Sequence, residues 1–144
     1  MRDNERNMYV DSSPEHCKEA CAKSLSRLGL QHIDLYYCCC LDRKTPVERT
    51  VQAMAEPKKE GKIKYLGFSE CSADSLRHAH KVHPITAVQI EYSLFALDIE
   101  DDQVSLLKTT RELGVAIVAY SPIGRGMVAC ARERHLPYSC NNEG

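Results

Sequence analysis

The strongest constraint in the sequence is a fourfold alternation between stretches with helical periodicity and short apolar stretches bounded by turn residues. The apolar stretches begin near residues 32, 63, 86 and 115. A short, continuous apolar run is typical of a strand covered on both faces, whereas apolar residues at three- and four-residue spacing indicate the buried face of a helix. Helix, short loop and buried strand in repetition predict a parallel α/β fold with four strands.

Capping residues support two of the expected helices. Ser13 is a good N-cap residue and Pro14 suits the first turn of the helix that follows. Gly29 supplies the left-handed residue that commonly ends a helix. Ser72 is expected to cap the third helix, which Pro84 stops.

The second and fourth helices carry less regular signals. Residues 45–48 (TPVE) form a capping box, in which the glutamate reaches back to the threonine amide. Pro57 lies inside the second helix and removes a hydrogen bond there, so we expect a kink or an early end. Asp101 or Asp102 is expected to cap the fourth helix, with Val104 on its apolar face.

The two ends of the chain lack this organisation. Residues 1–12 are predicted to be a polar, poorly ordered arm, and residues 127–144 lose all periodicity and are predicted to be an irregular tail. We therefore expect the folded domain to cover residues 13–126.

Composition and charge exclude several classes of function. The 144 residues include 19 basic and 20 acidic residues and carry a net charge of −1. The chain therefore lacks the excess of positive charge that is typical of nucleic-acid-binding proteins. No apolar run approaches the ~18 residues needed to span a membrane, and the first residues lack the apolar stretch of a secretory signal. We expect a cytoplasmic protein that binds neither nucleic acid nor membrane.

Cysteine is abundant, with eight residues in the chain. In the cytosol thiols stay reduced, so we predict free cysteines rather than disulfides. The sequence has no CxxC pair, and structural zinc sites usually show paired ligands at short, regular spacing. We predict no metal site.

Polar residues follow the predicted strands, where ligands bind in parallel α/β folds. Ser69 and Gln89 could hydrogen-bond an amide, and Tyr120 offers a flat face for stacking. The turn at residues 122–126 exposes backbone amides and an arginine suited to a phosphate. A nicotinamide nucleotide needs this set of groups. Taken alone, however, the residues favour the simpler interpretation of a polar rim with a glycine-rich turn.

Four longer sequence motifs favour the nicotinamide interpretation over the simpler one. They are residues 28–37 (LGLQHIDLYY), 60–69 (EGKIKYLGFS), 87–93 (AVQIEYS) and 119–126 (AYSPIGRG). In this order and spacing they resemble the aldo-keto reductase family, and especially the branch with pyridoxal reductase-like and auxin-induced-like members. The resemblance covers about residues 15–128.

The resemblance implies a partial (β/α)₈ barrel, with about four βα units of the family's eight, and NADP(H) as the cofactor. It implies that Ser69 and Gln89 hold the nicotinamide carboxamide and that Tyr120 stacks on the ring. The residues implied to line the pyrophosphate are Ser121, Pro122, Ile123, Gly124 and Arg125. Small aldehydes or ketones would be the substrates.

The sequence departs from the family in its catalytic residues. The family's catalytic Asp, Tyr and Lys have no counterpart in these 144 residues, and Cys39 stands where the family has its active-site His. A thiol is a poor hydrogen-bond donor, and we expect Cys39 to be a buried, inert thiol rather than a nucleophile. The family segment that binds the 2′-phosphate of NADP is also missing, so a preference for NADP over NAD cannot be inferred from this sequence.

Three hypotheses follow. In the first, the chain is a truncated aldo-keto reductase, weak or inactive alone. In the second, it is a non-catalytic remnant of the family that binds a nucleotide or a protein. In the third, it is an incomplete version of a longer product. In each case four strands cannot close a barrel, so we expect self-association through the open sheet edges.

Overall fold

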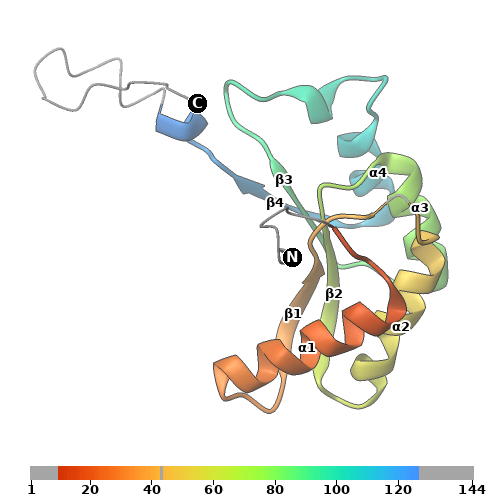
Figure 1. Cartoon of the computed structure of the whole chain (residues 1–144). Helices are drawn as coiled ribbons and strands as arrows, with labels where there is room; N and C mark the ends of the chain where they lie inside the picture. The colour runs from red at the N-terminus through yellow and green to blue at the C-terminus, as the bar shows by residue number, and fades with distance from the viewer. Residues whose placement is uncertain (1–9, 43, 127–144) are drawn as a thin grey trace, which may run out of the picture.

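The computed structural model describes residues 10–42 and 44–126. These residues form four parallel strands joined by helices, as the alternation in the sequence predicts (Figure 1). The elements in chain order are α1 (Pro14–Leu28), β1 (Ile33–Cys38), α2 (Val47–Lys59), β2 (Ile63–Ser69), α3 (Ala73–Val82), β3 (Ala87–Glu91), a 3-10 turn (Asp98–Glu100), α4 (Leu106–Leu113), β4 (Ala116–Tyr120) and a second 3-10 turn (Gly124–Gly126).

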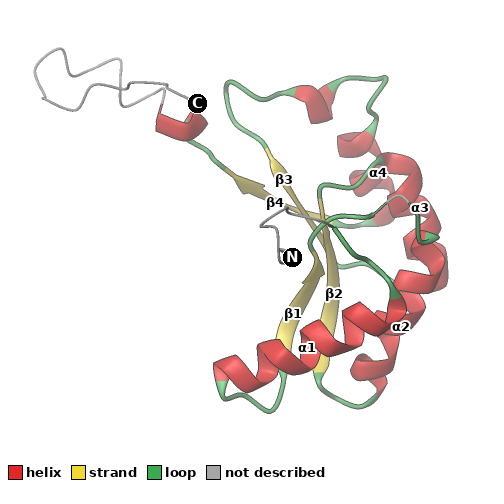
Figure 2. Ribbon diagram, in the orientation of Figure 1, coloured by secondary structure: helices red, strands yellow, loops and turns green. Residues whose placement is uncertain are grey.

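The strands lie in the order β1-β2-β3-β4, and every neighbouring pair is parallel. Helices α2, α3 and α4 therefore connect adjacent strands, α1 precedes β1, and the four helices lie on one side of the sheet (Figure 2). The fold class predicted from the sequence is confirmed: the arrangement is that of half of a (β/α)₈ barrel.

The hydrophobic core lies between the sheet and the helices. Strand side chains at alternate positions face the helices, and Leu66 and Phe68 of β2 and Val88 of β3 have no exposed surface. They pack with apolar side chains of α2, α3 and α4, which are Val51, Met54, Leu76 and Leu106. Burial of each such side chain stabilises the fold by ~1.5–3 kcal/mol.

The other face of the sheet carries no helix among the described residues (Figure 2). Tyr65 of β2 and Val118 of β4 lie on this uncovered face and are 45% and 38% exposed. The ring of Tyr37 lies over Gly67, its partner in the β1–β2 register. A Cβ at Gly67 would be 2.6 Å from Tyr37 Cε1, so the absence of a side chain at Gly67 is what allows the tyrosine ring to come this close.

Two helix starts agree with the sequence analysis. The Ser13 hydroxyl accepts a hydrogen bond from the His16 amide, and Gly29 ends α1 in the left-handed conformation, with φ 65°. The Ser72 hydroxyl accepts from the Ser75 amide at the start of α3.

The predicted capping box at α2 is wrong. Pro46 occupies the N-cap and makes no side-chain capping bond. The Thr45 amide and hydroxyl both donate to the carboxylate of Asp42, at 2.7 and 2.9 Å. Glu48 instead contacts His78 Nδ1 on α3 at 2.7 Å. The carboxylate of Asp42, three residues upstream, thus binds the threonine in place of the predicted capping box.

Pro57 does not end α2, contrary to the expectation of an early stop, because the helix continues to Lys59. Pro57 is buried and cannot donate a helix hydrogen bond. The other expectation, a kink, stays a prediction. Gly61, with φ 74°, follows the helix.

The fourth helix begins later than predicted. Its N-cap is Ser105, and α4 starts at Leu106. Asp101 accepts from the Gln103 amide at 2.7 Å, which closes a local turn instead of capping the helix. Val104 is 42% exposed and is not part of the core. The buried Ile99 anchors a separate 3-10 turn before this point.

The packed chain begins before residue 13. Ser12, predicted to belong to the polar arm, is fully buried. Its amide donates to Asp42 Oδ2 at 3.1 Å, and its carbonyl accepts from the Thr50 hydroxyl at 2.8 Å. Residues 1–9 of the predicted arm and the predicted tail, residues 127–144, lie outside the described residues.

Both outer strands have an unpaired edge within the described ranges, since β1 pairs only with β2 and β4 only with β3. Exposed residues Ala116, Val118 and Ala119 lie on β4. None of the helices described here is long and apolar enough to cross a membrane.

Candidate cofactor site at the strand ends

The strand register brings three predicted site residues to one face of the sheet. Ser69 at the end of β2 is the Cα partner of Gln89 on β3, and Gln89 is the partner of Val118 on β4. Tyr120 lies two residues beyond Val118, so it points to the same face. This is the uncovered face, and all three residues lie at the carboxyl ends of neighbouring strands.

Ser69 and Gln89 differ in their exposure. Ser69 is 9% exposed, whereas Gln89 is half-buried. A buried hydroxyl beside a half-buried amide offers both a donor and an acceptor to a flat polar group that lies across β2 and β3.

A glutamate that the sequence analysis gave no role fixes the position of Tyr120. The Tyr120 hydroxyl donates to Glu70 Oε1 at 2.5 Å, and the Glu91 amide donates to the same oxygen at 3.2 Å. The bond crosses the end of β3, because Tyr120 lies on β4 and Glu70 follows β2. Glu70 has φ 53°, so the chain turns sharply out of β2 at this residue.

The same carboxylate changes the acidity of the phenol. The hydrogen bond to Glu70, with smaller contributions from desolvation and from the negative charge of Glu91, raises the pKa of Tyr120 to about 12. An acid catalyst at neutral pH needs a lowered pKa. Tyr120 is therefore suited to stacking and hydrogen bonding, not to proton donation.

The turn after β4 contains several residues in the left-handed backbone conformation. Ser121, Gly124 and Arg125 all have positive φ, at 54°, 58° and 54°, and the Gly124 amide donates to the Ser121 carbonyl at 2.9 Å. A Cβ at Gly124 would be 2.5 Å from Phe95 Cδ2, so only glycine fits there. Pro122 and Ile123 are exposed between them.

The guanidinium of Arg125 is held by a carboxylate. Arg125 Nη2 lies 2.8 Å from Glu91 Oε2, and the arginine side chain is 74% exposed. A cavity of about 320 Å³ lies beside this ion pair, lined by Glu91, Ser93, Phe95, Ala96, Gly124 and Arg125. A phosphate bound here would have to draw Arg125 away from Glu91, which an exposed ion pair worth ~0–1 kcal/mol allows.

Cys39 is exposed, which overturns the expectation of a buried thiol. The strand β1 ends at Cys38, so the chain has already left the sheet at Cys39. Its neighbour Cys40 has φ 140°, a conformation rarely adopted by residues other than glycine.

All six cysteines in the described ranges are free, as predicted; Cys130 and Cys140 lie outside those ranges. Within these ranges no group of three or more His, Cys, Asp or Glu side chains is placed to hold a metal ion.

Sequence reasoning missed Glu70 and Glu91. Both follow or end strands at the predicted rim, and that position was the available signal. Glu70 has a positive φ, which no local pattern predicts.

Comparison with known proteins gives the family. The model of the Aldo/keto reductase family matches residues 3–143. The chain belongs to the aldo-keto reductase family. This aldo-keto reductase chain is 64% identical over 119 residues to aldo-keto reductase str7 of Strobilurus tenacellus, and 49% identical over 120 residues to probable aldo-keto reductase 1 of Glycine max.

Each of those alignments covers 83% of the chain but only 35% and 34% of the relative. The aldo-keto reductase chain thus spans about a third of the length of the curated relatives it matches. Among solved structures, the glycerol dehydrogenase of Gluconobacter oxydans superposes with a TM-score of 0.84 at 26% identity, covering 99% of this chain and 43% of that one. The holo form of an aldo-keto reductase from Bacillus halodurans gives a TM-score of 0.74 at 30% identity, covering 94% and 44%.

Proposed function

We propose that the strand ends bind the nicotinamide part of NADP(H), as a portion of an oxidoreductase that reduces small aldehydes or ketones by hydride transfer. One observation supports this proposal above the others: Ser69, Gln89 and Tyr120 lie on one face of the sheet at adjacent strand ends. Three strands thereby present a donor, an acceptor and an aromatic ring toward a single flat ligand.

The turn that follows β4 would hold the pyrophosphate. The residues proposed for this role are Ser121, Pro122, Ile123, Gly124 and Arg125. Their support is the run of positive φ values at Ser121, Gly124 and Arg125 and the exposed guanidinium. Bound NADPH would supply the hydride, while the residues of this chain would orient the ring and neutralise the phosphate charge.

The 144-residue chain alone is proposed to be weak or inactive as a reductase. Cys39 offers a thiol where a good hydrogen-bond donor would polarise the carbonyl. The pKa of Tyr120 is raised, not lowered, so this phenol does not protonate an alkoxide at neutral pH. The cytoplasm is the proposed compartment.

The test is a titration of the chain with NADPH and with NADH, followed by nicotinamide fluorescence. Gln89→Ala removes one hydrogen bond worth ~0.5–1.5 kcal/mol, so it should raise the Kd about 2- to 12-fold. Gln52→Ala is the matched control, because Gln52 is an exposed residue on α2. Equal affinity in both variants would count against the proposed site.

A second candidate function is binding without catalysis. It is favoured by the thiol of Cys39 and by the Glu70 carboxylate, which accepts a hydrogen bond from the Tyr120 hydroxyl. Turnover of aldehydes by the chain would exclude this candidate.

Association between copies of the chain through the sheet edges is also proposed. The unpaired edge of β4 carries exposed Ala116, Val118 and Ala119, and an exposed strand edge is a template for pairing. Sedimentation velocity at several concentrations tests this, since a monomer at all concentrations would contradict it.

A further inference from the structure

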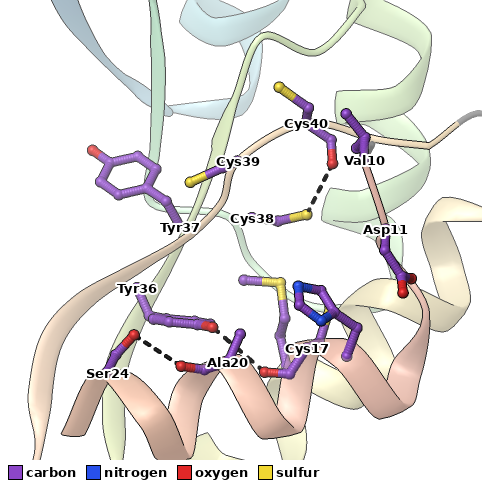
Figure 3. A pocket seen from close by; sticks show the side chains of 12 residues that line it. Val10, Asp11, Cys17, Ala20, Ser24, Tyr36, Tyr37, Cys38, Cys39 and Cys40 are labelled. Carbon is purple, nitrogen blue, oxygen red and sulfur yellow. Dashed lines mark hydrogen bonds between the residues drawn. The ribbon is translucent and has the colours of Figure 1, made fainter. Parts of the chain in front are cut away.

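A second cavity lies away from the candidate cofactor site, between α1 and β1 (Figure 3). Its volume is about 500 Å³, and its lining includes Ala20 and Ser24 of α1 and Tyr36 and Tyr37 of β1. Tyr36 points toward α1, where its hydroxyl donates to the Cys17 carbonyl at 3.4 Å, and Tyr37 points to the opposite side of the strand. A cavity that both tyrosines line reaches past an edge of β1. The other edge is paired with β2, so the cavity lies along the free edge.

The helix above this cavity has no second strand to cover. Helices α2, α3 and α4 each connect two neighbouring strands, whereas α1 leads only into β1 within the described residues. In parallel α/β folds a helix packs back onto the strands at its two ends. The cavity between α1 and the free edge of β1 is therefore the place where one more parallel strand would fit.

The opposite edge of the sheet shows the complementary lack of cover. In β4, Val118 on the uncovered face and Ala119 on the helix side are both exposed, whereas Leu66 and Phe68 of β2 are fully buried. No described strand pairs with the outer edge of β4. This strand thus lacks a strand neighbour and a covering helix, and the free edge of β1 together with α1 offers both.

We propose that two copies of the chain close one eight-stranded barrel, in which β4 of each copy pairs in parallel with β1 of the other. The inference rests on the association through sheet edges proposed above, and it adds the partner edge, the register and the number of copies. In the closed dimer the outward side of β4 fills the cavity beneath α1 of the second copy.

The register within one copy fits closure by two copies. Tyr37 pairs with Gly67, Gly67 with Ala87, and Ala87 with Ala116. The first residue of β4 is therefore level with the fifth residue of β1, which is a stagger of four residues across the sheet. An eight-stranded barrel of this class requires a stagger of eight in one full turn. Two copies supply it when Ala116 is level with Ile33 of the second copy, because the new junctions then add none.

This register also matches the faces of the two strands. It places Val118 beside Leu35 of the second copy and Tyr120 beside Tyr37. Leu35 is the partner of Tyr65 in the β1–β2 register, so it lies on the uncovered face, as Val118 does. A slip by one residue would turn these side chains to opposite faces. The apolar residues of both uncovered faces then meet inside the barrel, which is a packed core in this architecture.

The area available is sufficient for a stable dimer. With strands of five to seven residues, a spacing of ~4.8 Å and a rise of ~3.3 Å per residue, the uncovered face measures ~300 Å² in each copy. Each free edge adds ~160 Å² for a layer ~10 Å thick. Two faces and four edges give ~1,200 Å², which reaches the size of a standard specific interface.

Sedimentation velocity of the full chain at several concentrations tests the number of copies. We expect the 16.2 kDa monomer and its dimer with no larger species, because a ring that closes after two copies leaves no free strand edge. A series of larger species would overturn the closed dimer while leaving association through the edges in place. Monomer at every concentration would overturn both, and neither result bears on the nicotinamide titration.

Two lysine variants test the buried face. Val118 and Val104 are matched, since they are 38% and 42% exposed in one copy, but only Val118 would face the inside of the barrel. Val118→Lys should raise the dissociation constant of the dimer ~100-fold or more, because it buries an unpaired charge. Val104→Lys should leave that constant unchanged. Equal effects of the two substitutions would overturn the proposal.

A mixed sample of wild-type protein tests the register without any substitution. Copies with ¹³C-labelled valine methyl groups are combined with copies labelled only in leucine methyl groups. We expect a nuclear Overhauser effect between Val118 and Leu35, which are three strands apart in one copy, ~14 Å along the sheet. A dimer that lacks this signal would overturn the pairing of β4 with β1.

Discussion

Replacing Gly67 by alanine tests the packing on the uncovered face of the sheet. The added Cβ would lie 2.6 Å from Tyr37 Cε1 and 3.1 Å from the Ala87 carbonyl oxygen. Ordinary carbon contacts are ~3.5–4.0 Å, so the tyrosine ring must move by about 1 Å or rotate away. Overpacking of this kind costs ~1–3 kcal/mol, a large part of the ~5–15 kcal/mol that stabilises a domain.

The assay is urea denaturation of Gly67→Ala, Tyr37→Ala and the double variant. Gly67→Ala alone should lower the free energy of unfolding by ~1–3 kcal/mol. In the Tyr37→Ala background the obstructing ring is gone, so the same change should cost much less, which gives a coupling energy of ~1 kcal/mol or more. An equal cost in both backgrounds would refute the contact between Tyr37 and Gly67, and with it the β1–β2 register.

Two further predictions concern carboxylates. Glu70→Gln removes the charge that holds the phenol proton, so the pKa of Tyr120 should fall from about 12 toward its ordinary value, measured by NMR titration with ¹³C-labelled tyrosine; an unchanged titration would contradict the bond. For Asp42, burial raises the pKa, but hydrogen bonds from Thr45 and its neighbours outweigh this and hold the pKa well below its ordinary value. The contribution of Asp42 to the free energy of unfolding is therefore present above the unfolded pKa of ~3.9 and is lost as the pH falls below it. Asp42→Asn should be less stable than wild type at pH 7 and should lose less stability on acidification. Parallel profiles of unfolding free energy against pH for the two proteins would count against this.

The fold followed from the sequence where the signals are local. Four buried apolar runs predict four parallel strands. Ser13 and Ser72 begin their helices and Gly29 ends one, as the capping chemistry of these residues predicts. Each of these signals depends on residues within one turn of the chain. Tertiary packing leaves such signals unchanged when nothing else competes for the capping group.

Predictions failed where another group competes for the expected capping residue or changes the backbone before the helix. Thr45 loses its capping role to Asp42, and Asp42 is itself held by Ser12, 30 residues away in the sequence. The burial of Ile99 inserts a 3-10 turn before α4, so the acidic pair that follows cannot cap the helix. These contacts form only after the chain has folded.

The candidate site was predicted in its outline but not in its connections. Ser69, Gln89 and Tyr120 were expected at neighbouring strand ends, and the register places them there. The carboxylates of Glu70 and Glu91 that hold Tyr120 and Arg125 were missed, as was the exposure of Cys39. Each of these depends on the backbone conformation just beyond a strand, which sequence periodicity does not describe.

We propose that one nicotinamide ring contacts Ser69, Gln89 and Tyr120 together. The most direct test is a nuclear Overhauser experiment on the chain with selectively labelled tyrosine, titrated with oxidised nicotinamide mononucleotide. We predict magnetisation transfer between the nicotinamide ring protons and the Tyr120 ring protons, weakened in Gln89→Ala and unchanged in Gln52→Ala. Transfer to Tyr36 in the cavity beside α1, with none to Tyr120, would contradict the claim.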